Sequence, residues 1–222
     1  MHPAPSVIIF TALSGLGFGL LTFLTLGIPD VAGKTAFFFF FLGYTLAVGG
    51  LISSPFHLGN PQRALKAFSQ WRTSWLSREG VFAVLALIVT GIYAATLILF
   101  DQRLTFVGII GAVLSMISVF CTSMIYGQLK TVPRWNQPMT PALFILFTLA
   151  GGALLAAALK MAALFMVILG GAQLLHWLNG DKRLYQGGGT IEAATGLGHL
   201  GKVRLLESPH SGENYLLKEM AH

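Results

Sequence analysis

Uncharged apolar stretches alternate with short polar segments along this chain. A helix that crosses the hydrocarbon core of a bilayer needs about 20 predominantly apolar residues, and six stretches meet or approach that length. They are Ser6–Ile28, Ala36–Phe56, Val81–Phe100, Leu104–Tyr126, Pro141–Leu159 and Met161–Leu178. The pattern predicts an all-α fold, a polytopic bundle of six antiparallel transmembrane helices.

Only Lys160 separates the last two stretches. At 1.5 Å per residue a single helix over both would be about 57 Å long, nearly twice the thickness of the hydrocarbon core. We therefore expect a tight hairpin with Lys160 at its turn. The first stretch is not a cleavable signal peptide, because the first basic residue is Lys34 and the apolar run is too long. Gly15 and Gly19 within it predict close helix packing.

Composition supports a membrane protein. The chain is 55% hydrophobic and 10% charged, whereas a soluble domain averages about 25% charged residues. This excludes a cytosolic globular enzyme and a disordered chain. The single cysteine, Cys121, excludes a disulfide scaffold and an iron–sulfur cluster held by this chain alone, which needs about four thiolates. We expect no metal site, no catalytic residue and no nucleic-acid partner.

The two ends of the chain differ in character. Residues 1–178 are predicted to form the transmembrane domain, and residues 179–222 a polar cytoplasmic tail or loop. Gly196–Gly201 fits the pattern G-x-G-x-x-G, but no strand precedes it, so it does not indicate a nucleotide site. The run Gly187–Gly189 is typical of a turn.

Basic residues gather on one predicted face. Eight lie in the loops after the second and fourth spans and just after the sixth: Arg63, Lys66, Arg72, Arg78, Lys130, Arg134, Lys182 and Arg183. The other face has three: Lys34, Arg103 and Lys160. The positive-inside rule places the first group in the cytoplasm, and we expect the N-terminus outside. Four Trp residues lie on the cytoplasmic side, which indicates a docking or ligand surface: Trp71, Trp75, Trp135 and Trp177.

Three ionisable residues are candidates for chemistry on that face. Glu79 lies at the entrance of the third span, His57 at the end of the second and His176 near the end of the sixth. Ionisable groups at membrane depth are costly and are functional candidates by default. A structural role remains open for Glu79 and His57, because a helix dipole favours an acid near its start and a histidine near its end.

The loop between the second and third spans suggests a ligand. It brings a histidine, a glutamate, an arginine and indole rings to one membrane edge, as a quinone headgroup requires. We expect the quinone site between the inner ends of these spans, with His57, Arg63 and Glu79 as polar members. Three aromatic residues are weaker candidates and are expected to pack around the headgroup: Tyr126, Trp71 and Trp75. Four basic residues are expected to dock a partner protein: Lys130, Arg134, Lys182 and Arg183. Determination of topology alone would explain the basic charges but not His57 and Glu79.

The motif His57-Leu-Gly-Asn-Pro-Gln-Arg63, the segment Ser74–Glu79, Tyr126 and Thr131-Val-Pro-Arg-Trp135 together resemble the membrane anchor subunit of dimethyl-sulfoxide reductase, and most closely the branch that anchors sulfite dehydrogenase. The resemblance continues into the tail at Thr195–Arg204. It implies a heterotrimer in the bacterial cytoplasmic membrane, with a molybdopterin catalytic subunit and an iron–sulfur subunit on the cytoplasmic face. The anchor would exchange electrons with ubiquinone or menaquinone, carry no haem, and use His57, Arg63 and Glu79 for quinone binding.

Family anchors usually have eight spans, and this sequence has six before its polar tail, so two helices of the family pattern are missing from it. Two other functions stay open. A haem b electron-transfer subunit would use His57 and His176 as axial ligands. A small secondary transporter would need polar groups at mid-membrane and an internal repeat, and neither is evident in the sequence.

Overall fold

The computed structural model describes residues 5–57, 66, 68–130, 132–186 and 191–204, and in these ranges the regular elements are all helices. They run in the order α1 Pro5–Thr25, α2 Gly33–Ser53, the 3-10 helix η1 Ser54–His57, α3 Trp75–Phe100, α4 Thr105–Gly127, α5 Met139–Leu155, α6 Leu159–Gln186, α7 Ile191–Thr195 and the 3-10 helix η3 Gly198–Leu200. Five are long and apolar enough to cross a membrane, and α5 is a shorter apolar helix of 17 residues. The predicted polytopic helical bundle is confirmed.

The helices differ from the predicted spans mainly at two ends. α3 begins at Trp75 rather than at Val81, because Ser74 caps it: its Oγ accepts a hydrogen bond from the Ser77 backbone N–H at 3.5 Å. Arg78 and Glu79 therefore belong to the helix. α6 continues to Gln186, past the apolar part of its sequence.

The hairpin between α5 and α6 is present. Its turn is formed by residues 156–158, just ahead of Lys160, and Ala157 has a φ of 55°. The backbone N–H of Ala158 closes the turn by donating to the carbonyl of Ala153 at 2.9 Å.

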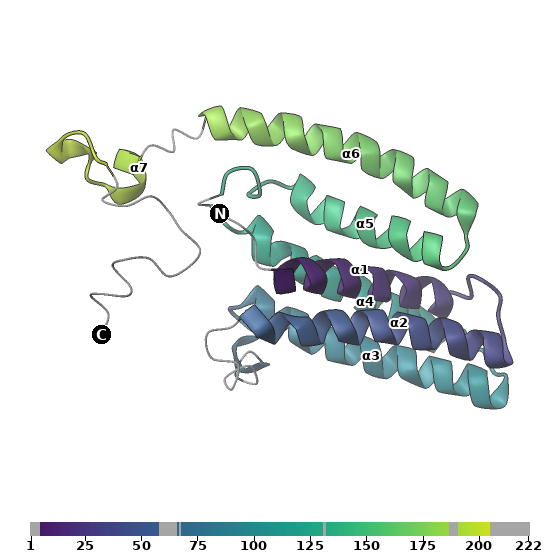
Figure 1. The fold of residues 1–222 in the computed structure, drawn as a ribbon. Coiled ribbons are helices and arrows are strands. Elements are labelled where there is room, and N and C mark those ends of the chain that lie inside the picture. Colours follow the sequence, from purple (N-terminus) through teal and green to yellow (C-terminus); the bar gives the residue numbers. More distant parts are fainter. Residues whose placement is uncertain (1–4, 58–65, 67, 131, 187–190, 205–222) are drawn as a thin grey trace.

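Helix α1 lies at the centre of the bundle and packs against α2, α4 and α5 (Figure 1). α3 packs mainly against α4, and α6 packs mainly against α5, with Phe165 of α6 also meeting Phe23 of α1 edge-on at 6.3 Å between ring centres. Glycines let α1 approach its neighbours closely: a methyl group on Gly17 would collide with the backbone of Ala47 in α2, and one on Gly19 with the backbone of α5 at Thr148. The packing role predicted for Gly19 is therefore confirmed.

The ends of the helices define two faces. One, here called the long-loop face, holds the start of α1, residues 54–57, 66 and 68–74, residues 128–130 and 132–138 and the end of α6; the other, the short-loop face, holds residues 26–32, 101–104 and 156–158 (Figure 1). The Oγ of Ser53, at the end of α2, donates to the carbonyl of Ser6 at 3.2 Å. The start of α1 and the end of α2 thus lie on one face. From the sequence, the N-terminus is predicted to lie on the face opposite the loop between the second and third spans. This prediction is wrong, because two antiparallel crossings return the chain to its starting side.

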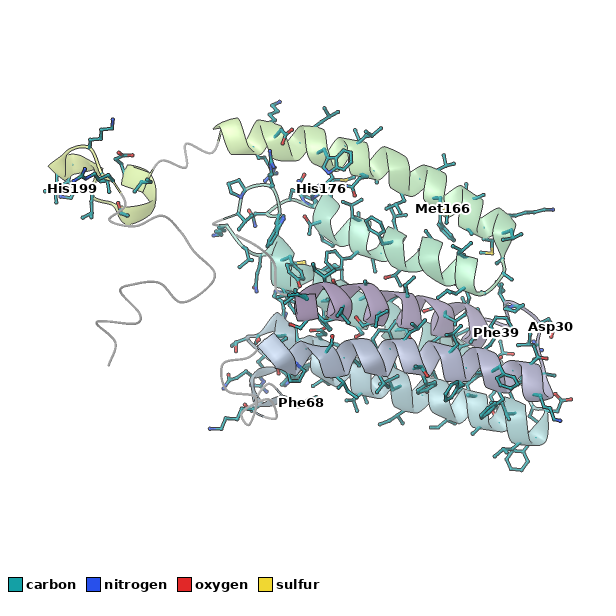
Figure 2. All side chains as sticks on the ribbon, in the orientation of Figure 1. Asp30, Phe39, Phe68, Met166, His176 and His199 are labelled. Atoms are coloured by element: carbon teal, nitrogen blue, oxygen red, sulfur yellow. The ribbon has the colours of Figure 1, made fainter. Side chains whose placement is uncertain are left out.

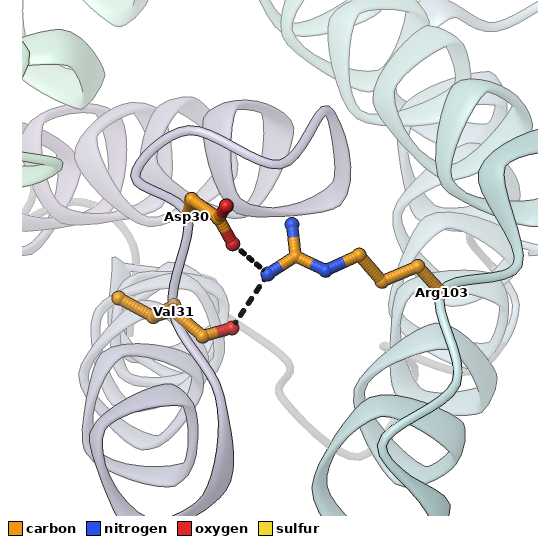
Figure 3. Close-up of polar contacts among 3 residues, drawn as sticks. All are labelled: Asp30, Val31 and Arg103. Carbon is orange, nitrogen blue, oxygen red and sulfur yellow. Dashed lines mark hydrogen bonds and ion pairs between the residues drawn. The ribbon is translucent and has the colours of Figure 1, made fainter.

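Arg103 links two interhelical connections on the short-loop face. Its Nη2 forms an ion pair with Asp30 and donates a hydrogen bond to the carbonyl of Val31 at 3.1 Å (Figure 3). This contact ties the α1–α2 connection to the α3–α4 connection. The seven described members of the predicted basic group lie on the long-loop face, at Lys66, Arg72, Arg78, Lys130, Arg134, Lys182 and Arg183.

The described part of the tail is short and local. The Glu192 carboxylate of α7 accepts a hydrogen bond from the backbone N–H of Val203 at 3.1 Å, and His199 lies in η3 (Figure 2). No strand precedes Gly196 in the described residues. Residues 187–189, predicted as a turn, lie outside the described residues.

Candidate functional site

Glu79 is a buried carboxyl in the second turn of α3, near the long-loop face, and only 4% of its surface is exposed. Its Oε1 accepts a hydrogen bond of 2.7 Å from the Thr122 hydroxyl of α4. Small residues bring the two helices together at this height, with Ser77 and Ala83 buried on α3 and Ser118 buried on α4. The sequence places Glu79 at the mouth of a span, whereas the structure turns its side chain into the bundle.

Within the described part of the chain, Glu79 forms no ion pair. Withdrawing an ionised carboxylate from water costs several kcal/mol unless a charge or hydrogen bonds compensate it. The hydroxyl of Thr122 supplies one hydrogen bond, while the hydroxyls of Ser77 and Ser118 are buried without a partner among the described residues. Glu79 is therefore a place where the protein can hold a proton inside the bundle, on a helix interface that also holds two unpartnered hydroxyls.

Thr122 can accommodate Glu79 in either protonation state. Its Oγ1 lies 2.7 Å from Glu79 Oε1 and 3.1 Å from the carbonyl oxygen of Ser118. When the carboxylate is charged, the hydroxyl donates to it. When the carboxyl is protonated, its O–H can donate a hydrogen bond to Thr122, which then donates to the carbonyl of Ser118 instead, because a hydroxyl both donates and accepts.

Arg78 organises the entrance to α3. Its guanidinium lies 4.3 Å from the centre of the Trp75 ring, its Nε donates to the carbonyl of Trp71 at 3.0 Å, and its Nη2 donates to that of Arg72 at 2.7 Å. Trp75 in turn packs edge-on against Phe120 of α4, with ring centres 5.9 Å apart. Trp75 is thus part of the α3–α4 contact that carries Glu79, whereas the Trp71 side chain is 52% exposed.

Tyr126 belongs to an aromatic cluster near the end of α4. Its ring stacks on Phe144 of α5, with centres 5.5 Å apart, and meets Trp135 edge-on at 5.6 Å. The cluster joins α4, the following loop and α5 one turn beyond Thr122, the partner of Glu79. Thr122 and Phe144 were not among the predicted site residues.

The remaining polar candidates are only partly described. The backbone of His57 ends η1 on the long-loop face, its side chain is not among those described, and Arg63 lies outside the described residues. Their predicted contact with a quinone stays a prediction. Phe68 belongs to the same loop and packs near α3, where a methyl group on Gly80 would lie 3.1 Å from its ring (Figure 2).

His176 lies in α6 and faces the start of α5 (Figure 2). Its Nε2 is 3.3 Å from the Thr140 hydroxyl, and its carbonyl accepts a hydrogen bond from Gln137 Nε2 at 3.2 Å. α6 does not touch α2 or η1, since α1 and α5 lie between them. A haem held jointly by His57 and His176 finds no support in this arrangement, and the described residues contain no cluster of three potential metal ligands.

The four predicted docking residues lie on the long-loop face. Arg134 forms an ion pair with Asp181 at 2.7 Å, and Arg183 Nη1 donates to the carbonyl of Asn136 at 2.7 Å. Lys130 and Lys182 are exposed. Arg134 and Arg183 thus join the loop between α4 and α5 to the end of α6. The role of all four residues in docking stays a prediction.

Comparison with known proteins identifies relatives. The C subunit of sulfite dehydrogenase from Allochromatium vinosum is 29% identical over 255 aligned residues, which span all of this chain and 78% of that protein. Two Escherichia coli proteins, both named as chains of anaerobic dimethyl sulfoxide reductase, match over shorter stretches. YnfH is 32% identical over 56% of this chain and 44% of its own length, and the one designated C is 34% identical over 48% and 38%. No solved structure gives a significant match.

The match to a family covers most of the bundle. Residues 1–177 fit the family described as DMSO reductase anchor subunit (DmsC), and this range contains α1 to α5 and the apolar part of α6. It also contains Glu79, Thr122 and the aromatic cluster around Tyr126. The chain is therefore a multi-pass membrane protein that belongs to the DMSO reductase anchor subunit family.

Proposed function

We propose that this chain anchors a molybdopterin and iron–sulfur oxidoreductase, of the sulfite dehydrogenase or dimethyl sulfoxide reductase type, in the bacterial cytoplasmic membrane and exchanges electrons with the quinone pool. The observation that carries the proposal is the buried Glu79 carboxyl, hydrogen-bonded to Thr122 near the face that bears the basic loops. The family and its relatives support the anchoring role.

Quinone chemistry needs a proton carrier at this position. Reduction of a quinone to a quinol takes up two electrons and two protons, and oxidation of the quinol releases them. The electrons would pass to or from an iron–sulfur cluster of the docked subunit, so the proton groups must lie near the docking side. Glu79 meets this requirement, because it lies only five residues from the cap of α3 at Ser74. His57 and Arg63 are proposed to complete the site on the same side.

The long-loop face is the proposed cytoplasmic docking face. The positive-inside rule favours it, since seven described basic residues lie there against three on the short-loop face. Lys130 and Lys182 are exposed and available to acidic groups of a partner, where electrostatics mainly sets register and specificity. Arg134 and Arg183 hold the loop and α6 in the arrangement that the partner would meet.

Substitution of Glu79 by Gln tests the proposal in the purified complex. The amide keeps the size and the acceptor for Thr122 but cannot carry a proton at this position. We expect an assembled complex with unchanged turnover towards an artificial electron carrier and at least a ~100-fold loss of quinone-coupled turnover, the lower range for a general acid–base group. Asp101→Asn is the matched control, since Asp101 lies exposed at the opposite end of the same helix and asparagine tolerates its φ of 52°.

Two results would overturn the proposal. Parental quinone-coupled turnover in Glu79→Gln would remove Glu79 from the reaction. A purified chain that brings down no iron–sulfur or molybdenum subunit from membranes of its native host would remove the anchoring role.

A further inference from the structure

A groove opens between α1, α4 and α5, next to the Thr122–Glu79 hydrogen bond. Its volume is 440 Å³, within the range of about 300–1,000 Å³ that is usual for small-molecule sites. Aliphatic and aromatic side chains form most of its wall, among them Ile8, Leu16 and Phe147. Thr122 lines this groove and also hydrogen-bonds Glu79.

The shape of the groove follows from the packing of two helices. α1 and α5 run in the same direction, and near the short-loop face they touch at Gly19 and Gly152, where a methyl group on either would collide with the other helix. One turn closer to the long-loop face the contact is looser, because a methyl group on Gly15 would lie 3.3 Å from Thr148 Oγ1. Beyond this point the groove begins, and it lies towards the long-loop face, which is the proposed docking side.

The hydroxyls of the groove are not equivalent. Thr11 donates to the carbonyl of Val7 at 3.0 Å, and Ser14 donates to that of Phe10 at 2.6 Å, so both are used within α1. Thr122 instead directs its hydroxyl across a helix interface to Glu79. The groove is therefore a mostly apolar space in which Thr148 and Thr122 offer further hydroxyls, and that of Thr122 leads to the buried carboxyl.

We propose that this groove binds the isoprenoid quinone, with Thr122 as the positioning residue between a ring oxygen and Glu79; this rests on the function proposed above. Apolar walls suit the ring and the first isoprene units, and a hydroxyl beside them suits a carbonyl oxygen. A lipid acyl chain would fit the walls equally well, but it has no group that would use the Thr122–Glu79 pair. The site proposed from the sequence between α2 and α3 would then supply proton and charge groups, while the ring enters from the side of α1 and α5.

Blocking the groove tests where the quinone binds. Ala12 lines the groove from an exposed position, so Ala12→Phe narrows it without disturbing the core. We expect the assembled complex to keep its turnover with an artificial electron carrier while the KM for quinone rises about tenfold, as for lost ground-state binding. Ala95→Phe is the control, because Ala95 is exposed on α3 away from the groove. An unchanged KM in Ala12→Phe would overturn the proposal.

Removing the hydroxyl tests the positioning residue. Thr122→Val keeps the shape and deletes the hydrogen bond, and we expect a drop of about tenfold in quinone-coupled turnover that Thr122→Ser restores, in line with a hydrogen bond to a charged group. Thr45→Val is the control, since the Thr45 hydroxyl donates only within its own helix, to Phe41 at 2.8 Å. Equal losses in the Val and Ser variants, with unchanged KM, would show a packing role and overturn the assignment.

Labelling separates this proposal from the proposed function. In the assembled complex a photoreactive azidoquinone should modify residues 8–16 of α1 or 144–148 of α5, and excess native quinone should displace it. Labelling confined to residues 54–79, or a phospholipid retained in the groove while the label binds elsewhere, would overturn the groove even if Glu79→Gln abolishes quinone turnover. If Glu79→Gln leaves quinone turnover intact, the proposed function itself fails.

Discussion

The Thr122 hydroxyl donates a 2.7 Å hydrogen bond to Glu79, across the boundary between α4 and α3 and 43 residues apart in sequence. The pair joins the helix that begins at the 2–3 loop to the helix that ends at the 4–5 loop. It lies behind the proposed quinone groove and below the basic loops. Substitutions of these two residues can therefore affect the stability of the chain and the transfer of electrons to different extents.

Two substitutions of Glu79 should differ in stability. Glu79→Gln retains an acceptor for Thr122, so its free energy of unfolding should stay within about 1 kcal/mol of the parent. Glu79→Ala removes the acceptor for Thr122, which keeps only its bond to the carbonyl of Ser118, and leaves a cavity, so we expect a loss of about 1–3 kcal/mol. Thermal denaturation of the purified chain in detergent, followed by circular dichroism, measures both. Equal stability of the two variants would mean that the Thr122 contact contributes nothing to folding.

The close contact between α1 and α5 at Gly19 should tolerate no side chain. In Gly19→Ala the new methyl group would collide with the backbone of α5, so α1 and α5 must separate, and we expect a loss of about 1–3 kcal/mol, the range for overpacking a filled interface. Gly49→Ala is the control, since nothing lies within 4 Å of a methyl group there. Heat-induced aggregation of the two variants in one detergent compares them. A Gly19→Ala protein as stable as Gly49→Ala would contradict the observed packing.

Orientation can be read by cysteine labelling of intact cells. The native Cys121 is buried and is first replaced by alanine. Lys66→Cys lies on the long-loop face, and Gln102→Cys on the short-loop face leaves the Arg103–Asp30 pair in place. We expect an impermeant external reagent to label position 102 and not position 66. The reverse pattern would place the basic loops outside the cell.

Partner docking should depend on the exposed lysines. Replacing Lys130 and Lys182 by Gln should weaken association with the soluble subunits at low salt, with little effect at high salt, where surface charges are screened. The stability of the chain alone should not change, because both side chains are exposed. Pull-down of the partner subunits at two salt concentrations measures the effect. If the double Gln variant retains the partner subunits at low salt as well as the parent does, these lysines have a role in topology only.

Arg134 should behave differently from the lysines. Its ion pair with Asp181 holds the 4–5 loop against α6, so Arg134→Gln should loosen this loop even in the chain without partners. Both side chains are about half exposed, at 55% and 54%, and a surface pair contributes little, about 0–1 kcal/mol. The expected effect is thus local to the loop: limited proteolysis should cut near residues 128–138 faster in Arg134→Gln than in the parent. Asp181→Asn should give the same pattern. Identical cleavage rates in the parent, Arg134→Gln and Asp181→Asn would show that the ion pair does not hold the loop.

The helical spans follow from hydropathy, because twenty apolar residues have few alternatives in a bilayer. Their ends do not, since charges at Arg78 and Glu79 suggest an interface while the Ser74 cap and the burial of Glu79 extend α3 through them. Thr122 is hard to predict because a single hydroxyl in an apolar span has no distinctive signal. Its spacing with Ser115 and Ser118, at i, i+3 and i+7, marks a small polar stripe on one helix face that could have indicated it.

α6 is longer than a membrane crossing requires. Its 28 residues extend about 42 Å at 1.5 Å per residue, against a hydrocarbon core of about 30 Å. The last eight residues therefore form a rigid spacer above the lipid, braced through Asp181 by the neighbouring loop. In the proposed complex, the length of this spacer would set the height and the rotational angle at which Lys182 and Arg183 meet a docked subunit. Deleting residues 179–181 would lower those charges by about 4.5 Å and turn them by about 60°, so in the proposed complex the length of α6 would fix the distance between the docked subunit and the membrane surface.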